Sequence, residues 1–307
     1  MKPEENGVWE GEKTVEPGIG QVVLTLGDGE SMPLKRDTNR LIFGGTMLQV
    51  RNERGTLVYS KIKSKEASEK IVYNTLTVPV RERFQLVLAD GTKVFLNSGS
   101  EMRYPERFGK ARREVFLKGE AWFEVAKDSA REFWVHAGAM DVKVLGTSFN
   151  VKAYERLETV ATTLVEGSVE VACAGKSFQI VPGEQFVYDK NNRVMDVRMV
   201  DTESYVSWKD GYYKFRQTTL EEIMETLSVW YGLNVFYVNE SAKQVEFTGK
   251  VKRYEDARML LDKFEQTGDV VFDIKGNNVF ITIKQKKPFA REWNSFLVKA
   301  RGMVWQS

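Results

Sequence analysis

Between Gln21 and about Val200 the chain consists of short runs in which apolar and polar residues alternate, separated by turns rich in glycine, aspartate and asparagine. An alternation with a period of two places every second side chain on one face of a β-strand. Asp28-Gly29 and Asp90-Gly91 each separate two such runs, and an Asp-Gly pair supplies the positive φ angles of a tight hairpin turn. The pattern predicts an antiparallel, jelly-roll-like β-sandwich of two facing sheets.

The bounds of the runs give the individual strands. We predict strands at 22–26, 84–88, 93–96, 114–117, 121–125, 133–136, 141–145, 148–153, 159–165, 168–171, 178–181 and 185–188. No part of this region carries a helical period longer than two turns. We therefore expect one all-β domain over residues 21–205.

After Trp208 the period changes, because two amphipathic helices occur among the strands. The first is predicted to begin with Thr218 and Glu221 in the spacing of a capping box and to end at Gly232. The second runs from Ala257 and ends at Gly268. Predicted strands flank both helices, at 213–216, 234–238, 245–251, 270–274 and 279–283. This order predicts a small α+β domain of two βαβ-like halves over residues 206–285.

The two ends of the chain differ from both domains. Residues 1–20 are polar and carry no sustained period, which is typical of a linker. The tail 286–307 places Phe289, Trp293, Phe296 and Leu297 at helical spacing, so a short docked helix is expected there.

Charge and cysteine content exclude several classes of function. The 45 basic and 43 acidic residues are interspersed and nearly balance, so no nucleic-acid partner is expected. Cys173 is the only cysteine, which excludes an intrachain disulfide and a cysteine-cluster metal site. No run approaches the length of a membrane span, and the start of the chain lacks a signal-peptide pattern. We expect either a cytosolic protein or one from which a targeting segment has been removed.

No group of residues predicts an active site. His136 is the only histidine and lies within a predicted strand, with no nucleophile motif nearby. Glu120 and Glu124 share a face of a strand, a spacing that strands produce by chance. The pairs Gly18/Gly20 and Gly44/Gly45 lack the following helix that a phosphate site requires. We expect no enzyme, no cofactor and no metal.

A series of ordered motifs resembles the FecR family of inner-membrane sigma regulators. In the first half the motifs are 73–79 (YNTLTVP), 90–97 (DGTKVFLN), 104–108 (YPERF), 113–125 (REVFLKGEAWFEV), 142–151 (VKVLGTSFNV), 163–171 (TLVEGSVEV) and 182–185 (PGEQ). In the second half they are 208–211 (WKDG), Phe215, 230–232 (WYG), 247–249 (FTG) and 280–283 (FITI). The chain departs from the family at 80–83 (VRER), where members usually carry a glycine-containing turn. The resemblance covers roughly residues 20–285.

The resemblance implies a signalling function. Members have a cytosolic segment that holds an extracytoplasmic-function sigma factor, one membrane helix and a periplasmic remainder, and this chain resembles that remainder alone. The 1–20 linker would then follow the membrane helix, and the protein would be periplasmic and tethered to the inner membrane. The C-terminal domain is similar to the short signalling domain of TonB-dependent transporters and secretins. The implied partner is the signalling domain of such an outer-membrane transporter, whereas sigma factor and membrane would be contacted only through the missing segments.

Two sets of residues are candidate sites. A small α+β domain can accept a partner strand at an exposed sheet edge, so we predict partner binding at Tyr213, Lys214 and Phe215 or at Val279, Phe280 and Ile281. Some family members are processed at a Gly-Thr bond, matched here by Gly146-Thr147. The Thr147 hydroxyl would attack the Gly146 carbonyl in an acyl shift, whereas the alternative is a hairpin or bulge between two strands.

A carbohydrate-binding β-sandwich is the alternative from a different class. The eight aromatics that could form a stacking platform are Trp122, Phe123, Trp134, Trp208, Tyr212, Tyr213, Trp230 and Tyr231. A solvent-facing row of these rings would favour sugar binding, and their burial would favour the regulator.

Overall fold

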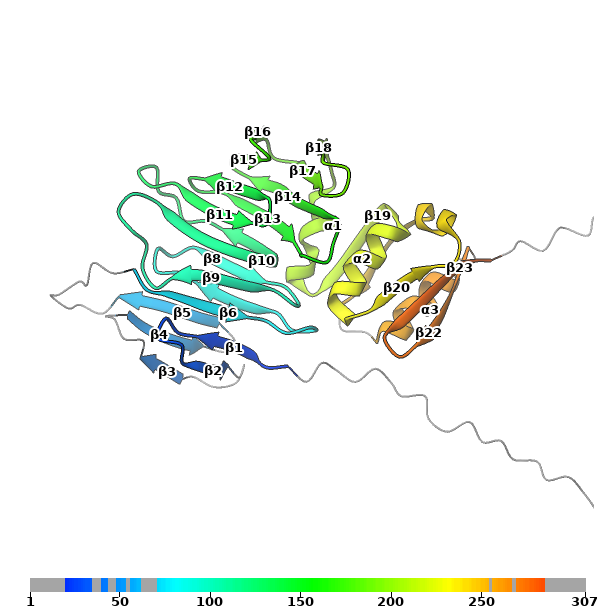
Figure 1. Ribbon diagram of the computed structural model, residues 1–307. Helices are drawn as coiled ribbons and strands as arrows, with labels where there is room; N and C mark the ends of the chain where they lie inside the picture. The colour runs from blue at the N-terminus through cyan, green and yellow to red at the C-terminus, as the bar shows by residue number, and fades with distance from the viewer. Residues whose placement is uncertain are drawn as a thin grey trace, which may run out of the picture.

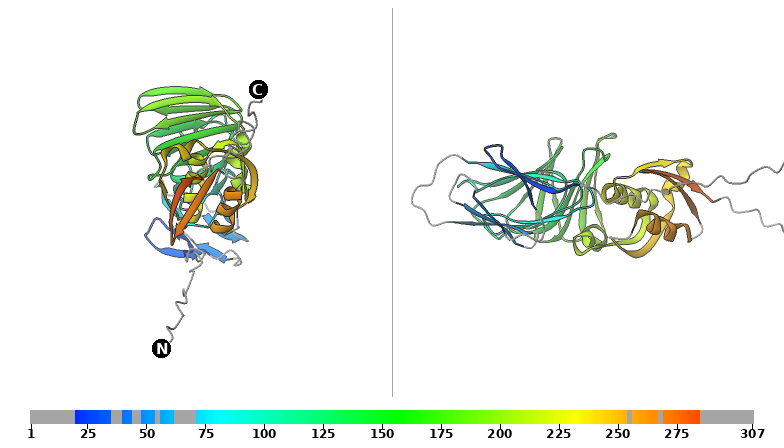
Figure 2. Two further views of the ribbon diagram at one scale, coloured as in Figure 1. Left: turned by 90° about the vertical axis from the view of Figure 1, so that its right-hand side faces the viewer. Right: turned by 90° about the horizontal axis from the view of Figure 1, so that it is seen from below.

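The structure, a computed structural model, describes residues 20–34, 40–43, 48–53, 56–61, 71–253, 256–266 and 269–284. It consists of a large β-body followed by a small α+β domain, which lie end to end (Figure 1; Figure 2, right). The predicted fold class, a mainly β chain with an antiparallel sandwich and a terminal α+β domain, is confirmed. The predicted linker and the predicted tail helix lie outside the described residues, apart from Gly20.

The β-body contains eighteen described strands in two facing sheets that share one strand. They are β1 Val22–Thr25, β2 Ser31–Leu34, β3 Arg40–Phe43, β4 Leu48–Glu53, β5 Thr56–Lys61, β6 Tyr73–Thr77, β7 Phe84–Val87, β8 Lys93–Leu96, β9 Glu101–Pro105, β10 Arg113–Glu124, β11 Phe133–Ala137, β12 Met140–Val144, β13 Ser148–Ala153, β14 Thr159–Glu166, β15 Val169–Cys173, β16 Lys176–Ile180, β17 Glu184–Asp189 and β18 Val194–Met199. The first sheet has the order β2-β1-β6-β9-β10-β11-β12-β15-β16. The second has the order β3-β4-β5-β7-β8-β10-β13-β14-β17-β18.

The core lies between these two sheets, because the apolar residues of each strand alternate toward the other sheet. Its fully buried members include Leu24, Leu76, Leu86, Phe123, Phe133, Phe149, Val171 and Phe186. Both predicted Asp-Gly hairpins are confirmed, since β1 pairs antiparallel with β2 and β7 with β8.

Strand β10 corrects one prediction. The separate strands expected at 114–117 and 121–125 form one continuous strand that passes from the first sheet into the second. Gly119 allows the change of direction, because its φ is +106° and a Cβ there would lie 2.7 Å from the Ser100 Cα. The sequence pattern failed here because a glycine inside a strand and a glycine in a turn look alike.

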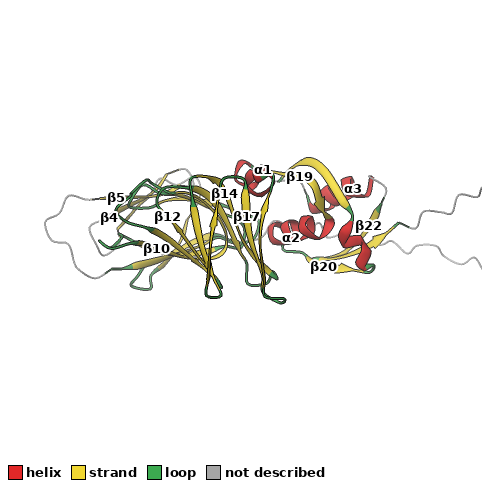
Figure 3. Ribbon diagram, turned by 90° about the horizontal axis from the view of Figure 1, so that it is seen from above, coloured by secondary structure: helices red, strands yellow, loops and turns green. Residues whose placement is uncertain are grey.

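The α+β domain contains two small sheets and the helices between them. Its elements are α1 Thr202–Val206, a 3-10 turn Ser207–Asp210, β19 Tyr212–Thr219, α2 Leu220–Tyr231, β20 Asn234–Tyr237, a 3-10 turn Glu240–Gln244, β21 Glu246–Lys252, α3 Ala257–Gln266, β22 Val270–Lys275 and β23 Asn278–Ile283. Strands β19 and β21 pair antiparallel, and a three-stranded sheet has the order β20-β23-β22. The apolar faces predicted for both helices are buried. Helix α2 is the helix closest to the β-body in Figure 3, except for the short α1.

The start of α2 differs by one residue from the prediction. Thr219, not Thr218, is the N-cap, and its hydroxyl accepts a hydrogen bond from the Glu222 amide. Thr218 Oγ1 instead accepts from the Arg216 amide, because the strand is irregular just before the helix. Two adjacent threonines fit the same capping pattern, so the sequence alone could not choose between them.

Three further features were not anticipated or departed from the family pattern. Strand β18 and helix α1, neither of which was predicted, contain no fully buried residue. At the turn where family members usually carry a glycine, Arg81 adopts a φ of +67°, and its amide donates to Ser98 Oγ.

Each helix in the described part of the chain is too short or too polar to span a bilayer.

Candidate functional site: the seam between the domains

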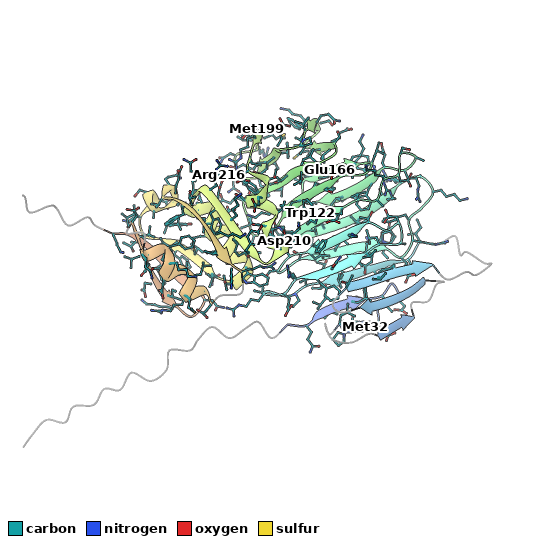
Figure 4. All side chains as sticks on the ribbon, turned by 180° about the vertical axis from the view of Figure 1, so that it is seen from behind. Met32, Trp122, Glu166, Met199, Asp210 and Arg216 are labelled. Atoms are coloured by element: carbon teal, nitrogen blue, oxygen red, sulfur yellow. The ribbon has the colours of Figure 1, made fainter. Side chains whose placement is uncertain are left out.

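Polar and aromatic residues from several sequence motifs meet where the β-body contacts the α+β domain. Asn97, Glu120, Trp122 and Asn150 come from the β-body, at the end of β8 and on β10 and β13; Trp208, Trp230 and Arg253 come from the α+β domain. We call these seven residues the seam. Each exposes 7% or less of its surface, although most carry a polar group. Figure 4 labels Trp122 at this junction.

Arg253, directly after β21, is fully buried in the seam. Its Nη1 donates to the Trp208 carbonyl at 2.7 Å and its Nη2 to Asn97 Oδ1 at 2.8 Å. The guanidinium lies 3.5 Å from the centroid of the Trp230 ring, a cation–π contact. This side chain therefore ties the α+β domain to the end of β8 in the β-body.

The polar side chains of the seam continue from Arg253 in a chain of hydrogen bonds. Asn97 Nδ2 donates to Glu120 Oε2 at 2.7 Å, and Asn150 Nδ2 donates to Glu120 Oε1 at 2.9 Å. The Trp208 indole N–H then donates to Asn150 Oδ1 at 3.2 Å. Because Arg253 also binds the Trp208 carbonyl, the hydrogen bonds form a closed ring that crosses between the domains twice.

Apolar contacts and ion pairs extend the seam on either side of this ring. Trp122 belongs by its contacts to the core of the α+β domain, although it lies on β10 of the β-body. Ser98 Oγ donates to the Val229 carbonyl of α2 at 3.0 Å. At the rim, two partly exposed ion pairs join body to domain, Lys152–Glu225 at 3.4 Å and Arg198–Glu222 at 3.3 Å.

A cleft of about 390 Å³ lies between β13, β14 and β17 on one side and α1, β19 and α2 on the other. Several of its buried polar groups are partnered within the protein: Gln185 donates to Thr163 at 2.8 Å, and Asn150 and Glu120 belong to the ring. The buried hydroxyls of Ser204 and Tyr213 have no hydrogen-bond partner among the described residues. Burial raises the pKa of the Tyr213 phenol well above its ordinary value, so this group stays neutral at physiological pH. The arrangement is suited to holding the two domains together rather than to acid–base chemistry.

The first predicted partner-binding strand, β19, is largely covered. Tyr213 and Phe215 are buried in the domain core. The Lys214 amide donates to Ser207 Oγ at 3.2 Å, and its ammonium pairs with Asp201 at 3.1 Å and with Glu203. At Lys214 the outer side of β19 is therefore occupied by the turn that follows α1.

The second predicted strand, β23, is not a sheet edge, so that part of the prediction is wrong. Val279, Phe280 and Ile281 pair in parallel with β20 and antiparallel with β22. Val279 and Ile281 are fully buried, whereas the Phe280 ring lies on the other face of the sheet. The physical reason is that the connection after β20, through β21 and α3, returns the chain so that β23 lies between β20 and β22, which local sequence could not reveal.

That other face of the three-stranded sheet exposes apolar side chains. Phe236 is 48% exposed, Val238 62% and Val271 38%, and the Phe236 ring stacks on Phe280 with a centroid distance of 5.1 Å. We call these four residues the outer face. Strands β22 and β23 lie at the end of the α+β domain remote from the β-body, and β20 runs below α2 (Figure 1).

Gly146 and Thr147, the candidate cleavage site, lie in the connection between β12 and β13. Thr147 is buried, and its hydroxyl donates to the Ser168 carbonyl at 3.0 Å. A Cβ at Gly146 would lie 2.8 Å from the Lys127 Cα, so close packing accounts for the glycine. The register of β13 against β14 shifts directly afterwards, between Ser148 and Phe149, as expected of a bulge.

The surroundings of His136 and Cys173, the remaining candidate residues, are those of structural residues. His136 Nδ1 lies 2.7 Å from Asp141 Oδ1, and its ring stacks on Phe116. Cys173 is buried, as a small apolar residue would be. Within the described ranges, no group of three or more His, Cys, Asp or Glu side chains is placed to hold a metal ion.

The aromatic residues do not form a sugar-binding row. Six of the eight candidates are buried, namely Trp122, Phe123, Trp208, Tyr213, Trp230 and Tyr231. Trp134 and Tyr212 are half-buried and lie on different domains. This distribution favours the regulator over the carbohydrate-binding module.

Sequence reasoning missed most of the seam. Glu120 was attributed to chance, and Asn97, Asn150 and Arg253 were not singled out. The available signal was that polar residues sit at or near the ends of otherwise apolar motifs, as Asn97 does in 90–97 and Asn150 in 142–151.

Comparisons with known proteins agree with this architecture. The family model described as "FecR protein" matches residues 74–170, and the model described as "FecR, C-terminal" matches residues 212–281. Two crystal structures of a candidate anti-sigma factor from Parabacteroides distasonis ATCC 8503, at 1.65 Å and 2.50 Å resolution, are similar to this chain. Both are 27% identical and cover 69% of this chain; 99% and 100% of their own lengths match, with TM-scores of 0.63 and 0.62. No curated protein matches the chain.

These matches define the class of protein first: a regulator of sigma-factor activity. The chain belongs to the FecR family.

Proposed function

We propose that this chain is the periplasmic sensing part of a transmembrane FecR-type regulator. It relays the state of a TonB-dependent outer-membrane transporter to an extracytoplasmic-function sigma factor, through contact with the signalling domain of the transporter. The sigma factor and the inner membrane are contacted by other segments of the full-length protein. The α+β domain of about 206–285 is the transporter-facing unit.

The exposed outer face is the observation that carries this proposal. Apolar side chains gathered on one face of a sheet mark a surface for protein contact. Phe236, Val238 and Val271 of the outer face are exposed and lie on or beside strands that hold no seam residue, so a partner domain can reach the face without displacing the seam. The face replaces the strand edges as the predicted contact, because β19 is covered at Lys214 and β23 is central.

The test is binding to purified signalling domains of TonB-dependent transporters, measured by pull-down and by calorimetry. Phe236→Asp and Val238→Asp place charges on the outer face at exposed positions, so they should fold normally and weaken binding at least about tenfold, or about 1.4 kcal/mol. Met259→Asp is the matched control, because Met259 is 58% exposed but lies on α3. Full binding by both outer-face variants would contradict the claim that the outer face is the contact surface. Binding by a chain that lacks residues 208–307 would contradict the claim that the α+β domain contacts the transporter.

Self-cleavage at Gly146-Thr147 is a separate, single-turnover proposal. The hydroxyl of Thr147 attacks the Gly146 carbonyl carbon, the peptide C–N bond breaks as the ester C–O bond forms, and water then hydrolyses the ester. Mass spectrometry of freshly purified protein should show two fragments that Thr147→Ala abolishes and Thr147→Ser retains. An intact chain after prolonged incubation contradicts it.

A further inference from the structure

The ring of hydrogen bonds in the seam keeps an arginine and a carboxylate away from water, and the two come from different domains. Arg253 is 0% exposed and Glu120 is 7% exposed. Burying a charged group is unfavourable unless an opposite charge or well-placed hydrogen bonds compensate it. Arg253 finds part of that compensation only across the domain boundary, from Asn97, whereas Glu120 accepts its hydrogen bonds from Asn97 and Asn150 of its own domain.

Asn97 is the connection between them. Its amide nitrogen donates to Glu120 and its amide oxygen accepts from Arg253, so the amide dipole is aligned between the anion and the cation. The Ser98 amide donates to the same oxygen at 2.8 Å, which fixes the orientation of the Asn97 side chain. An amide oriented in this way transmits the attraction between two charges that do not touch.

We infer that the Glu120–Asn97–Arg253 bridge is a lock that makes the β-body and the α+β domain one cooperative unit. When the lock is closed, displacement of the α+β domain moves the β-body with it. The domains cannot separate partially, because any opening leaves the buried Arg253 guanidinium and the buried Trp208 indole N–H without their cross-domain acceptors, Asn97 and Asn150. The inference deepens the proposed function by describing how the relay passes between domains, and it rests on that function only for its signalling consequence.

Two further buried hydrogen bonds cross the boundary, from Trp208 to Asn150 and from Ser98 to the Val229 carbonyl, and neither involves a charged group. The ion pairs and apolar contacts of the seam cannot replace the bridge. The Lys152–Glu225 and Arg198–Glu222 pairs expose 21–45% of their side chains, so solvent and salt screen them. Trp122 and Trp230 supply apolar burial, which is non-directional and tolerates small displacements. The hydrogen bonds of Arg253 are directional and are lost after a shift of about 1 Å.

Arg253→Met tests the lock, followed by urea unfolding with two probes. Tryptophan fluorescence reports in part on the seam, which contains three of the seven tryptophans, Trp122, Trp208 and Trp230. Far-ultraviolet circular dichroism reports mainly on the β-body, which contains most of the described strands. The two transitions should coincide in the wild type and separate in Arg253→Met, with the fluorescence transition at lower urea. Arg216→Met is the matched control, because the Arg216 side chain is 69% exposed in the same domain.

The double variant Glu120→Gln/Arg253→Met separates a charge lock from simple packing. Once the carboxylate is neutral, the loss of the cation should matter less, so the double variant should recover part of the midpoint that Arg253→Met loses. Additive losses, or coincident transitions with an unchanged midpoint in Arg253→Met, overturn the inference. If Arg253→Met does not fold, Arg253→Lys supplies the comparison, since it keeps the charge and should retain coincident transitions.

Hydrogen exchange in the wild type provides a test without substitutions. The Arg253 amide, bound to the Gly211 carbonyl, should exchange with the same protection factor as amides of the β-body core, because the domains open together. Faster exchange of the whole α+β domain contradicts the lock. Failure of the transporter domain to bind would leave all these results standing, so the two proposals fail separately.

Discussion

The β-body and the seam each bury an arginine completely, but they surround it differently. Arg113 of the β-body forms an ion pair with Asp90 at 2.8 Å and donates to the carbonyls of Ala126 and Arg131, all within the same fold. Arg253 donates to the Trp208 carbonyl of its own domain and to Asn97 of the β-body.

The difference extends to the apolar cores. The core of the β-body lies between its own two sheets. The core of the α+β domain includes Trp122 of the β-body, with Phe95 and Val165 packed against it. The β-body is thus complete without its neighbour, whereas the α+β domain uses the β-body to finish its interior. In the proposed function, an α+β domain built in this way would pass a change of its position directly to the larger domain.

The largest expected effect comes from replacing Arg113, whose partners all lie within the β-body. Arg113→Met leaves Asp90 buried beside an apolar side chain, so the free energy of unfolding should fall by about 3–5 kcal/mol. Because the β-body supports the seam, both spectroscopic probes should shift together in a urea titration. A loss of stability below about 1 kcal/mol, or a loss confined to the α+β domain, would contradict the claim that Arg113 stabilises the β-body through its own contacts.

Trp122→Ala tests whether this residue of the β-body completes the core of the α+β domain. Removing this buried indole should cost about 3 kcal/mol, since it creates a cavity in the cluster of the α+β domain. Differential scanning calorimetry should show a new, earlier transition for that domain, with the β-body transition nearly unchanged. Trp134→Ala, at a half-buried position of the β-body, is the comparison and should produce no additional transition. Equal destabilisation of both domains would show that Trp122 belongs to the body.

Thr219→Ala tests the local structure of the helix that contacts the body. Loss of the N-cap hydrogen bond to Glu222 should reduce stability by about 1 kcal/mol. Thr218→Ala is the control, because its hydroxyl binds the Arg216 amide outside the helix, and its effect should be smaller. If chemical denaturation shows that Thr218→Ala loses more stability than Thr219→Ala, Thr218 is the N-cap, as the sequence predicted.

The smallest effect is a pH-dependent one on the surface of the β-body. The Lys143 ammonium lowers the pKa of Glu170, with help from Ser177, and Glu170 raises the pKa of Lys143. A carboxyl with a lowered pKa stabilises the fold above its ordinary pKa and loses that contribution as the pH falls through the folded value.

Lys143→Met should therefore lower the free energy of unfolding near pH 7 by less than about 1 kcal/mol, since both groups are partly exposed. The difference from the wild type should shrink between about pH 5 and pH 3. A difference that stays constant over this range would mean that the lysine acts through its contact with Trp134 instead.

Local sequence predicted what depends on local order. The hairpins at Asp28-Gly29 and Asp90-Gly91, the apolar faces of α2 and α3 and the order of the elements follow from period and turn chemistry. The continuity of β10 and the central position of β23 depend on pairing between distant segments, which no local pattern encodes. The seam could not be predicted from local sequence for the same reason, since Asn97 and Arg253 are 156 residues apart.

Hydrogen–deuterium exchange of the full chain, with and without a purified transporter signalling domain, tests the central claim most directly. The proposed contact predicts new protection in β20 and β23, which carry Phe236 and Phe280, and no loss of protection at the seam. Protection confined to the β-body, or opening of the seam on binding, would contradict the claim that the α+β domain is the transporter-facing unit of a coupled pair.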